Sequence, residues 1–123
     1  MLEAAKRHGC TAVGIEIKRE LCELSRERAR QAEVHKLVTI REEDLFESKF
    51  DDATVVAIYL FPGLLERLKP KFEQLKPGTR IVSHQFAIPG ATPDATETVS
   101  SSETGDAHRI YLWTTPLKTA PLK

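Results

Sequence analysis

The stretch Thr11-Ala-Val-Gly-Ile-Glu16 decides the fold of this chain. Val13–Glu16 predicts a short buried strand that ends in a carboxylate, and an amphipathic helix is predicted directly after it, over residues 18–34. One face of that helix carries mainly small side chains, which allow a close approach to a sheet: Leu21, Cys22, Ser25, Ala29 and Ala32. A strand followed at once by such a helix is typical of a wound α/β sheet, in which ligands bind beyond the carboxyl ends of the strands.

The carboxylate of Glu16 stands where such a sheet binds a nucleoside. An acidic side chain at the end of a strand can accept hydrogen bonds from both hydroxyls of a ribose. The alternative is a solvated glutamate that merely ends the strand. The pattern that follows Glu16 in the chain has to decide between the two.

The rest of the chain continues as alternating elements. The beginning, residues 2–8, predicts the end of a helix, and Pro70 is expected to kink or split the helix predicted over residues 64–75. Further strands are predicted over residues 37–41, 54–60 and 79–86, the second of them buried on both faces, and a hairpin over 95–101 and 109–115. This order predicts an α/β fold: a mostly parallel sheet with a C-terminal antiparallel hairpin, in one domain over residues 1–116, followed by a tail at 117–123.

Composition limits the partners. The chain of 123 residues has 18 basic and 18 acidic side chains, so it lacks the positive charge that marks most nucleic-acid-binding proteins. No nucleic-acid partner is expected, although modest RNA contact stays open. No apolar run approaches the roughly 20 residues of a membrane span, and the start lacks the apolar region of a signal peptide. A cytoplasmic protein is expected.

Cysteine and histidine show no metal-binding spacing. Cys10 and Cys22 are interpreted as two buried thiols, with a disulfide or a catalytic thiol as the alternatives. The four histidines are scattered along the chain, so no metal site is expected.

Three strand ends carry the candidate ligand-binding groups. Glu16 ends the first strand, Asp44 lies just past the second, and the segment 59–62 (Tyr-Leu-Phe-Pro) ends the third. Parallel, adjacent strands would bring these ends to one rim. Asp44 could accept a hydrogen bond from an adenine amine, and Ile17 and Leu45 would form apolar walls beside the base.

Tyr59 and Pro62 would then face the reactive end of the ligand. Each residue has a structural alternative: Asp44 as a helix cap or loop carboxylate, and Tyr59 as a core aromatic whose hydroxyl reaches the surface. Ser83-His84 is interpreted as a strand end without a role.

The order of these motifs resembles a known family. From Ala4 to about Thr115 the chain is similar to the downstream part of class I S-adenosylmethionine-dependent methyltransferases, on the segments 12–17 (Ala-Val-Gly-Ile-Glu-Ile) and 42–46 (Glu-Glu-Asp-Leu-Phe). More narrowly, the segments 58–62 and 75–86 resemble bacterial relatives of the lysine methyltransferases that modify the c subunit of ATP synthase.

This resemblance implies S-adenosyl-L-methionine as the cofactor and a protein lysine as the methyl acceptor. It assigns Glu16 to the ribose and Asp44 to the adenine, with Ile17, Leu45 and Tyr59 as further cofactor contacts. It also assigns Tyr59 and Pro62 to the catalytic site.

The chain departs from this family at its beginning. The family's first strand and glycine-rich loop are not found, and that strand is the central one, between the strands that end at Glu16 and begin at Thr54. The resemblance therefore implies an N-terminally truncated methyltransferase, in which weak or no cofactor binding is expected until an upstream glycine-rich segment is added. Two alternatives stay open: a nucleotide-binding Rossmann domain of an oxidoreductase, and a non-catalytic remnant that associates with itself through open sheet edges.

Overall fold

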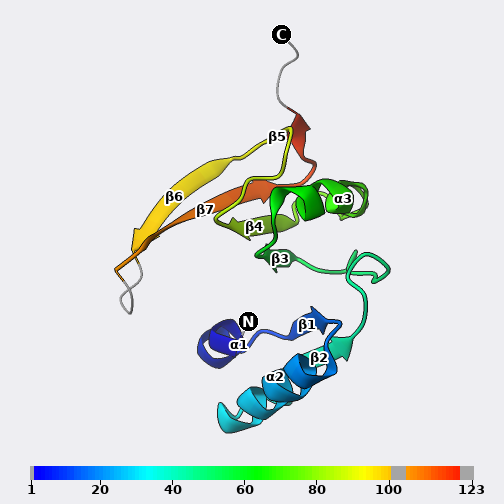
Figure 1. Cartoon of the computed structure of the whole chain (residues 1–123), viewed down its shortest axis with the longest axis vertical. Coiled ribbons are helices and arrows are strands. Elements are labelled where there is room, and N and C mark those ends of the chain that lie inside the picture. The colour runs from blue at the N-terminus through cyan, green and yellow to red at the C-terminus, as the bar shows by residue number, and fades with distance from the viewer. Residues whose placement is uncertain (1, 101–104, 120–123) are drawn as a thin grey trace. The chain divides into compact units, whose positions relative to one another are not determined.

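The computed structural model describes residues 2–100 and 105–119, and the chain forms two compact units, Met1–Lys49 (unit 1) and Phe50–Lys123 (unit 2). Unit 1 contains α1 (Leu2–His8), β1 (Ala12–Glu16), α2 (Arg19–Gln31) and β2 (Val38–Glu42). Unit 2 contains β3 (Val55–Ile58), α3 (Pro62–Glu73), β4 (Arg80–His84), β5 (Ala91–Thr92), β6 (Ala95–Ser100), β7 (Ala107–Thr114) and β8 (Lys118–Thr119) (Figure 1).

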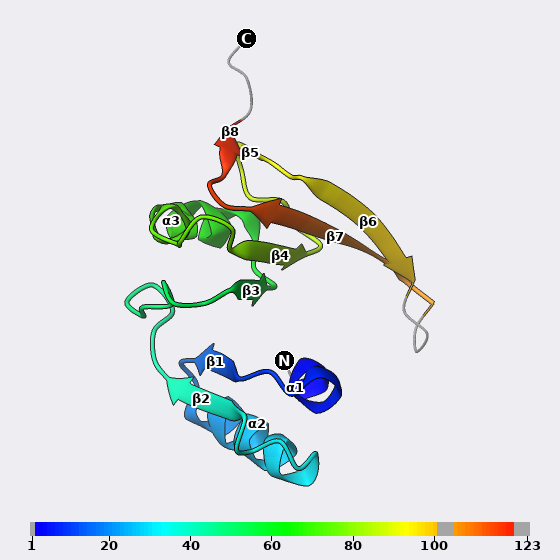
Figure 2. The same ribbon diagram turned by 180° about the vertical axis from the view of Figure 1, so that it is seen from behind.

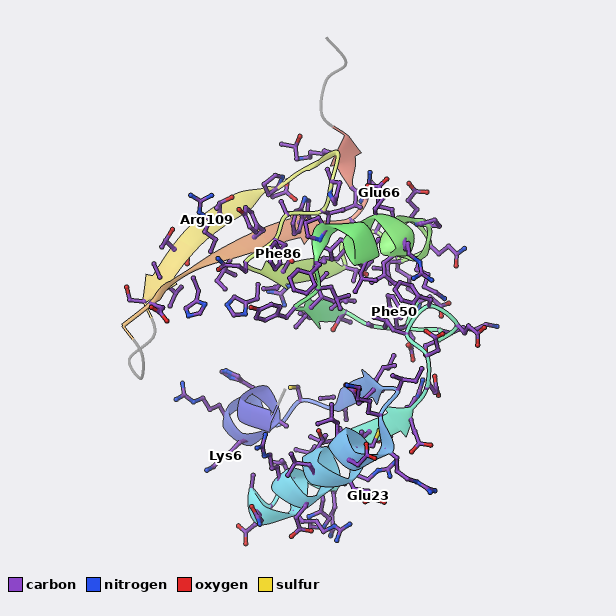
Figure 3. The ribbon with its side chains drawn as sticks, in the orientation of Figure 1. Lys6, Glu23, Phe50, Glu66, Phe86 and Arg109 are labelled. Atoms are coloured by element: carbon purple, nitrogen blue, oxygen red, sulfur yellow. The ribbon has the colours of Figure 1, made fainter. Side chains whose placement is uncertain are left out.

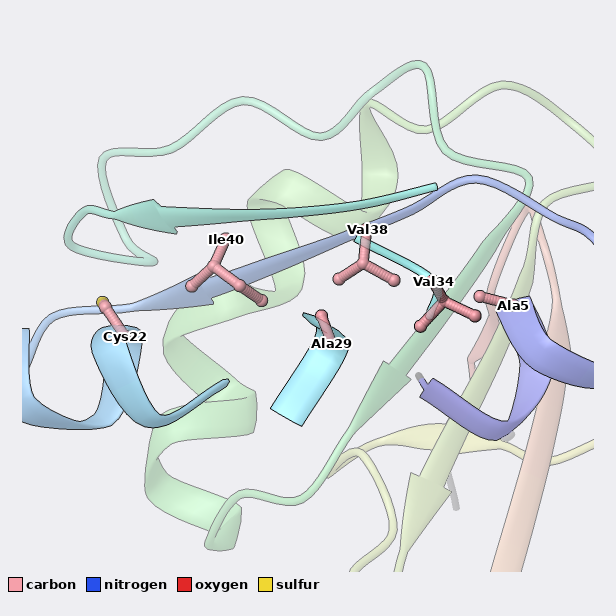
Figure 4. Close-up of a cluster of buried hydrophobic side chains, with 6 residues drawn as sticks. All are labelled: Ala5, Cys22, Ala29, Val34, Val38 and Ile40. Atoms are coloured by element: carbon pink, nitrogen blue, oxygen red, sulfur yellow. The ribbon is translucent and has the colours of Figure 1, made fainter. Parts of the chain in front are cut away.

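Unit 1 is a two-stranded parallel sheet with α2 packed on it. The register pairs Ala12 with Val38 and Glu16 with Glu42, so both strands end at the same edge. The guanidinium of Arg26 donates a hydrogen bond of 2.9 Å to the carbonyl of Ile40 and so fastens α2 to β2. The core of this unit consists of small and β-branched side chains from both helices, β2 and the turn before it: Ala5, Cys22, Ala29, Val34, Val38 and Ile40 (Figure 4).

The structure confirms the predicted β-α-β order of unit 1 and corrects two details. Helix α2 buries Cys22 and Ala29 as expected, but Leu21, assigned to the same face, is 42% exposed. The interpretation of two buried thiols is wrong for Cys10, which is exposed, and right for Cys22. Cys10 follows Gly9 in the link between α1 and β1, outside any regular element, so no packed layer covers it.

Unit 2 contains a four-stranded sheet in the order β3-β4-β7-β6. Strand β3 runs parallel to β4, and β7 runs antiparallel to both β4 and β6, which confirms the predicted hairpin. The expected turn of that hairpin falls partly on residues 101–104, outside the described residues. Helix α3 lies alongside β4 in both views (Figures 1 and 2) and contributes Leu65, Leu68 and Phe72 to the core, where Ile81 and Trp113 are also buried.

Two expectations for unit 2 are corrected, and at Pro70 one of the two expected outcomes, the split, is excluded. The strand expected to be buried on both faces is not, because one face of β3 is exposed, with Val55 at 45%, and the other is only half-buried. Helix α3 is assigned as one helix that contains Pro70, and Pro62 opens its first turn, so it is not split. Residues 118–119 of the expected tail form β8, which pairs with β5, a short strand that was not predicted.

The strand pairing agrees with the family arrangement that the resemblance implies. Strands up to His84 pair in parallel, and later strands pair antiparallel. Within residues 2–100 and 105–119 no pairing joins β1 to β3, the two strands between which the family has its central strand. None of the described helices is long and apolar enough to cross a membrane.

Candidate functional site

Glu16 lies at the carboxyl end of β1 and is held there by its neighbours. Its carbonyl oxygen accepts a hydrogen bond of 3.0 Å from the backbone N–H of Glu43 and one of 3.3 Å from the Cys22 thiol. Its side-chain Oε1 accepts a hydrogen bond of 3.1 Å from the backbone N–H of Lys18 at the start of α2. The side chain is half-buried, so the carboxylate is fixed in place and still reachable by a ligand.

Asp44 lies two residues beyond the end of β2. Its Oδ1 accepts a hydrogen bond of 2.9 Å from the backbone N–H of Phe46, a turn in which the aspartate bonds the chain two residues on. Its carbonyl accepts the hydroxyl of Ser48 at 2.8 Å. Asp44 Oδ1 therefore acts as the loop carboxylate of the structural alternative. Oδ2 is the oxygen that would bind a ligand.

The loop around Asp44 borders an open depression of about 290 Å³, lined by Glu43, Asp44, Glu47 and Ser48. The Ser48 hydroxyl is within 2.7 Å of Glu43 Oε2, which ties this loop together. Three carboxylates around one depression favour ligands that present hydrogen-bond donors, such as an amine or a hydroxyl.

The structure brings Glu16 and Asp44 to one edge of unit 1. Because β1 and β2 are parallel and in register at Glu16 and Glu42, the residues after them leave the sheet at the same edge, and the Glu43–Glu16 hydrogen bond joins the two strand ends. Ile17, next to Glu16, is 64% exposed, and Leu45 is half-buried. An exposed isoleucine beside a fixed carboxylate gives this edge both an apolar and a hydrogen-bonding part.

Tyr59 and Pro62 belong to unit 2. Tyr59 follows β3 and is 60% exposed, so it is not the core aromatic of the structural alternative. Pro62 stands in the first turn of α3, where its fixed φ and missing N–H suit the start of a helix, and Phe61 before it is extended. That the groups of the two units meet at one site stays a prediction.

Aromatic rings gather around Tyr59. The centroid of its ring lies 4.3 Å from that of the His84 ring, which is nearly perpendicular to it, and 6.3 Å from that of the Phe86 ring. Phe86 in turn lies 5.3 Å from Phe61, which is 67% exposed. Figure 3 shows Phe86, labelled, beside β4.

No sequence motif indicates the histidine pair next to Tyr59. His84 Nε2 and His108 Nδ1 are 2.8 Å apart and share a hydrogen bond. The two residues are 24 positions apart, so no local spacing links them. The register of β4 and β7 sets His84 opposite Ile110, which makes His108 its diagonal neighbour on the same face.

The residue after His84 has an unusual backbone. Gln85 has a φ of 75°, a left-handed conformation that is uncommon for a residue other than glycine. Two hydrogen bonds to Arg109 of β7 hold it: Gln85 N–H donates to the Arg109 carbonyl, and Arg109 N–H donates to Gln85 Oε1. This clamp ends β4 and fixes the backbone from which His84 projects.

Burial raises the pKa of the Cys22 thiol, and the negative charge of Glu42 adds to this effect. A thiol must ionise to act as a nucleophile, so the shift opposes the catalytic-thiol alternative at this position. Cys22 instead packs in the core and donates to Glu16.

Residues 1–95 match the family model described as the ANTKMT methyltransferase domain. The chain is 37% identical over 103 residues to a protein-lysine N-methyltransferase of Saccharolobus islandicus. That alignment covers 83% of this chain and 63% of the relative. It is 35% identical over 94 residues to the lysine N-methyltransferase of Mus musculus that is named for the c subunit of ATP synthase, over 76% of this chain and 38% of that protein.

Among solved structures, the fold is similar to an RNA methyltransferase of Salinibacter ruber in complex with S-adenosyl-L-homocysteine. The TM-score is 0.82 and the identity 41%, over 99% of this chain and 76% of that one. The chain spans less than two thirds of the length of the two lysine methyltransferases from Saccharolobus islandicus and Mus musculus.

Proposed function

Because the chain belongs to the ANTKMT methyltransferase domain family, we propose that it serves the transfer of a methyl group from S-adenosylmethionine to a lysine amine of a protein. The observation that supports this most directly is the common edge of β1 and β2, where Glu16 and Asp44 project from joined strand ends. The lysine assignment is supported by the names of the curated relatives from Saccharolobus islandicus and Mus musculus.

In this proposal, unit 1 binds the adenosyl part of the cofactor. Glu16 accepts hydrogen bonds from the ribose hydroxyls, and Asp44 Oδ2 accepts one from the adenine amine. Ile17 and Leu45 lie against the base. The side-chain carboxylates of both acids are already held by hydrogen bonds from backbone N–H groups, so little conformational entropy is lost when the ligand binds.

Unit 2 serves the methyl acceptor. The Tyr59 hydroxyl and nearby main-chain carbonyls hold the amine in line with the methyl group, and Pro62 fixes the chain direction after β3. The cofactor supplies the reactive methyl group, so the protein contributes mainly orientation. A lysine amine attacks only as the neutral form, so its proton has to leave first.

Calorimetric titration tests the proposed function. S-adenosylhomocysteine and a nicotinamide dinucleotide are titrated into this chain, and into the chain expressed with whatever coding sequence precedes it in its genome. Heat of binding for S-adenosylhomocysteine, with none for the dinucleotide, supports the proposal. Binding of the dinucleotide instead, or of neither compound to either form, contradicts it. Family membership does not favour the nicotinamide-binding alternative.

Methyl transfer to RNA is the second candidate function. It is supported by the described activity of the Salinibacter ruber relative, and the equal numbers of acidic and basic residues speak against it. Transfer of a radiolabelled methyl group to a mixture of cellular protein and RNA, followed by ribonuclease or protease treatment, separates the two. We expect the label to survive the ribonuclease and be released by the protease.

Self-association through the open edges of β1 and β3 is a further prediction from the sequence. Each of these strands has one partner within the described residues. Sedimentation velocity tests it, since a concentration-independent monomer contradicts it.

A further inference from the structure

We propose that His84 and His108 form a proton-accepting pair that takes the proton released by the substrate amine next to Tyr59. This inference rests on the proposed function, because it presumes an amine held at the Tyr59 hydroxyl. It adds a step that the cofactor does not perform: the ammonium group has to become an amine before it can attack.

The geometry of the pair suits one extra proton. A hydrogen bond between two ring nitrogens 2.8 Å apart needs one N–H and one bare nitrogen. Two neutral rings satisfy this, and so does a pair with one added proton on an outer nitrogen. A second added proton would put N–H groups on both facing nitrogens and break the hydrogen bond. The pair therefore accepts a single proton without losing its contact.

The position of the pair links it to the substrate end of unit 2. His84 is the last residue of β4, and its ring contacts that of Tyr59, the residue after β3. Both histidines are half-buried, so part of each residue stays accessible to water. The Gln85–Arg109 clamp holds the strand end that carries His84.

The charges near the pair come from three strands. The register puts Glu97 of β6 opposite Ile110, on the face that carries His84 and His108, and Arg80 lies on the same face of β4. Asp106 lies two residues before His108. Arg109 follows His108 directly in β7, and the ring of Tyr59 contacts that of His84, so acidic and basic residues both flank the pair.

The proton step is balanced. The lysine ammonium gives one proton to an imidazole nitrogen of the pair, and the nitrogen keeps the electron pair. That electron pair then forms the new N–C bond, while the bonding electrons of the S–C bond stay on the sulfur of the sulfonium cofactor. The pair afterwards releases its proton to water through an outer nitrogen.

Proton-detected NMR of isotope-labelled histidine in this chain tests the pair without any cofactor. We expect the ring-nitrogen resonances of His84 and His108 to change together as the pH is lowered, because the two rings share one hydrogen bond. In His108→Gln the remaining His84 should titrate in a single step, and the exposed His35 should titrate identically in both proteins. Independent single-step titration of both histidines in the unchanged chain would overturn the proposal.

The pH dependence of methyl transfer tests the role, in the form of the protein that transfers methyl groups. We expect His84→Gln to lower kcat/KM about a hundredfold near pH 7, the usual minimum for losing a proton-transfer group. This deficit should shrink to within about threefold near pH 10, where the lysine ammonium loses its proton to water without help from the protein. His35→Gln is the matched control and should leave the profile unchanged.

The outcomes separate the two proposals. A deficit that is absent, or equal at every pH, in an enzyme that does transfer methyl groups overturns the proton-accepting role and leaves the proposed function standing. Failure of the unchanged protein to transfer methyl groups at any pH, with the coupled titration intact, overturns the proposed function. The histidine pair would then be a structural hydrogen bond, and its proton-accepting role would fall with it.

Discussion

Replacing Glu16 with glutamine should weaken cofactor binding without disturbing unit 1. The Glu16 Oε1 that accepts the Lys18 N–H at 3.1 Å has a counterpart in the glutamine side chain, so the local turn is kept. In place of Oε2, glutamine presents an NH₂ group, which cannot accept a hydrogen bond from a ribose hydroxyl. The substitution therefore removes one charge-assisted hydrogen bond and little else.

The size of the effect follows from the position of the side chain. A hydrogen bond to a charged group contributes about 1.5–3 kcal/mol, and the half-buried carboxylate of Glu16 belongs at the lower end of that range. About 1.5–2 kcal/mol corresponds to a dissociation constant roughly 10 to 30 times higher.

Calorimetry with S-adenosylhomocysteine measures this change in the form of the protein that binds the compound, and urea unfolding shows whether the fold is intact. Glu23→Gln, on the exposed face of α2, is the matched control and should bind as the unchanged protein does. Equal affinities for the two variants, both folded, would refute the assignment of Glu16 to the ribose.

Three further predictions concern the structure that supports the site. Leu68→Ala should lower the free energy of unfolding by about 2–5 kcal/mol, because Leu68 is 0% exposed and truncating its side chain leaves a cavity. Urea unfolding, followed by the fluorescence of the single tryptophan, measures this loss. A loss near zero contradicts the assignment of Leu68 to the core. Hydrogen bonds from the Lys118 ammonium and a backbone N–H lower the pKa of Asp94 below 3.8. The stability that Asp94 contributes is therefore complete above pH 3.8 and lost as the pH falls through its folded-state value, so acid titrations of the unchanged chain and Asp94→Asn should converge at low pH; a constant difference contradicts this. Iodoacetamide should modify exposed Cys10 in the folded chain and buried Cys22 only after unfolding, as mass spectrometry can show, and equal rates would contradict the burial of Cys22.

The β-α-β order and the candidate acids could be predicted from local sequence. Hydrophobic periodicity depends on residues a few positions apart, and β1, α2 and β2 each show it within their own segment. Glu16 and Asp44 were found because parallel neighbouring strands end at one edge, a rule that needs only the strand order. The turn role of one Asp44 oxygen is likewise a property of its immediate neighbours.

Burial could not be predicted from the same segments. The apolar run that contains β3 has the composition of a central strand, but what covers a strand depends on its partners, and Val55 is exposed beside β4 alone. Cys10 and Cys22 are the same residue type, and only the packing of α2 on β1 and β2 separates them. Lys118 and its neighbour in β8 pair with β5 across a separation in sequence that no local pattern records.

Local sequence specifies most of the helices and strands, the family to which the chain belongs, and the acids at the ends of β1 and β2. All of these depend on residue types at short spacing or on the order of motifs along the chain. Only the tertiary structure decided that His84 and His108 meet, because their hydrogen bond depends on the antiparallel register of β4 and β7. A register is set by the packing of whole strands, so residues 24 positions apart become neighbours although no local sequence pattern links them.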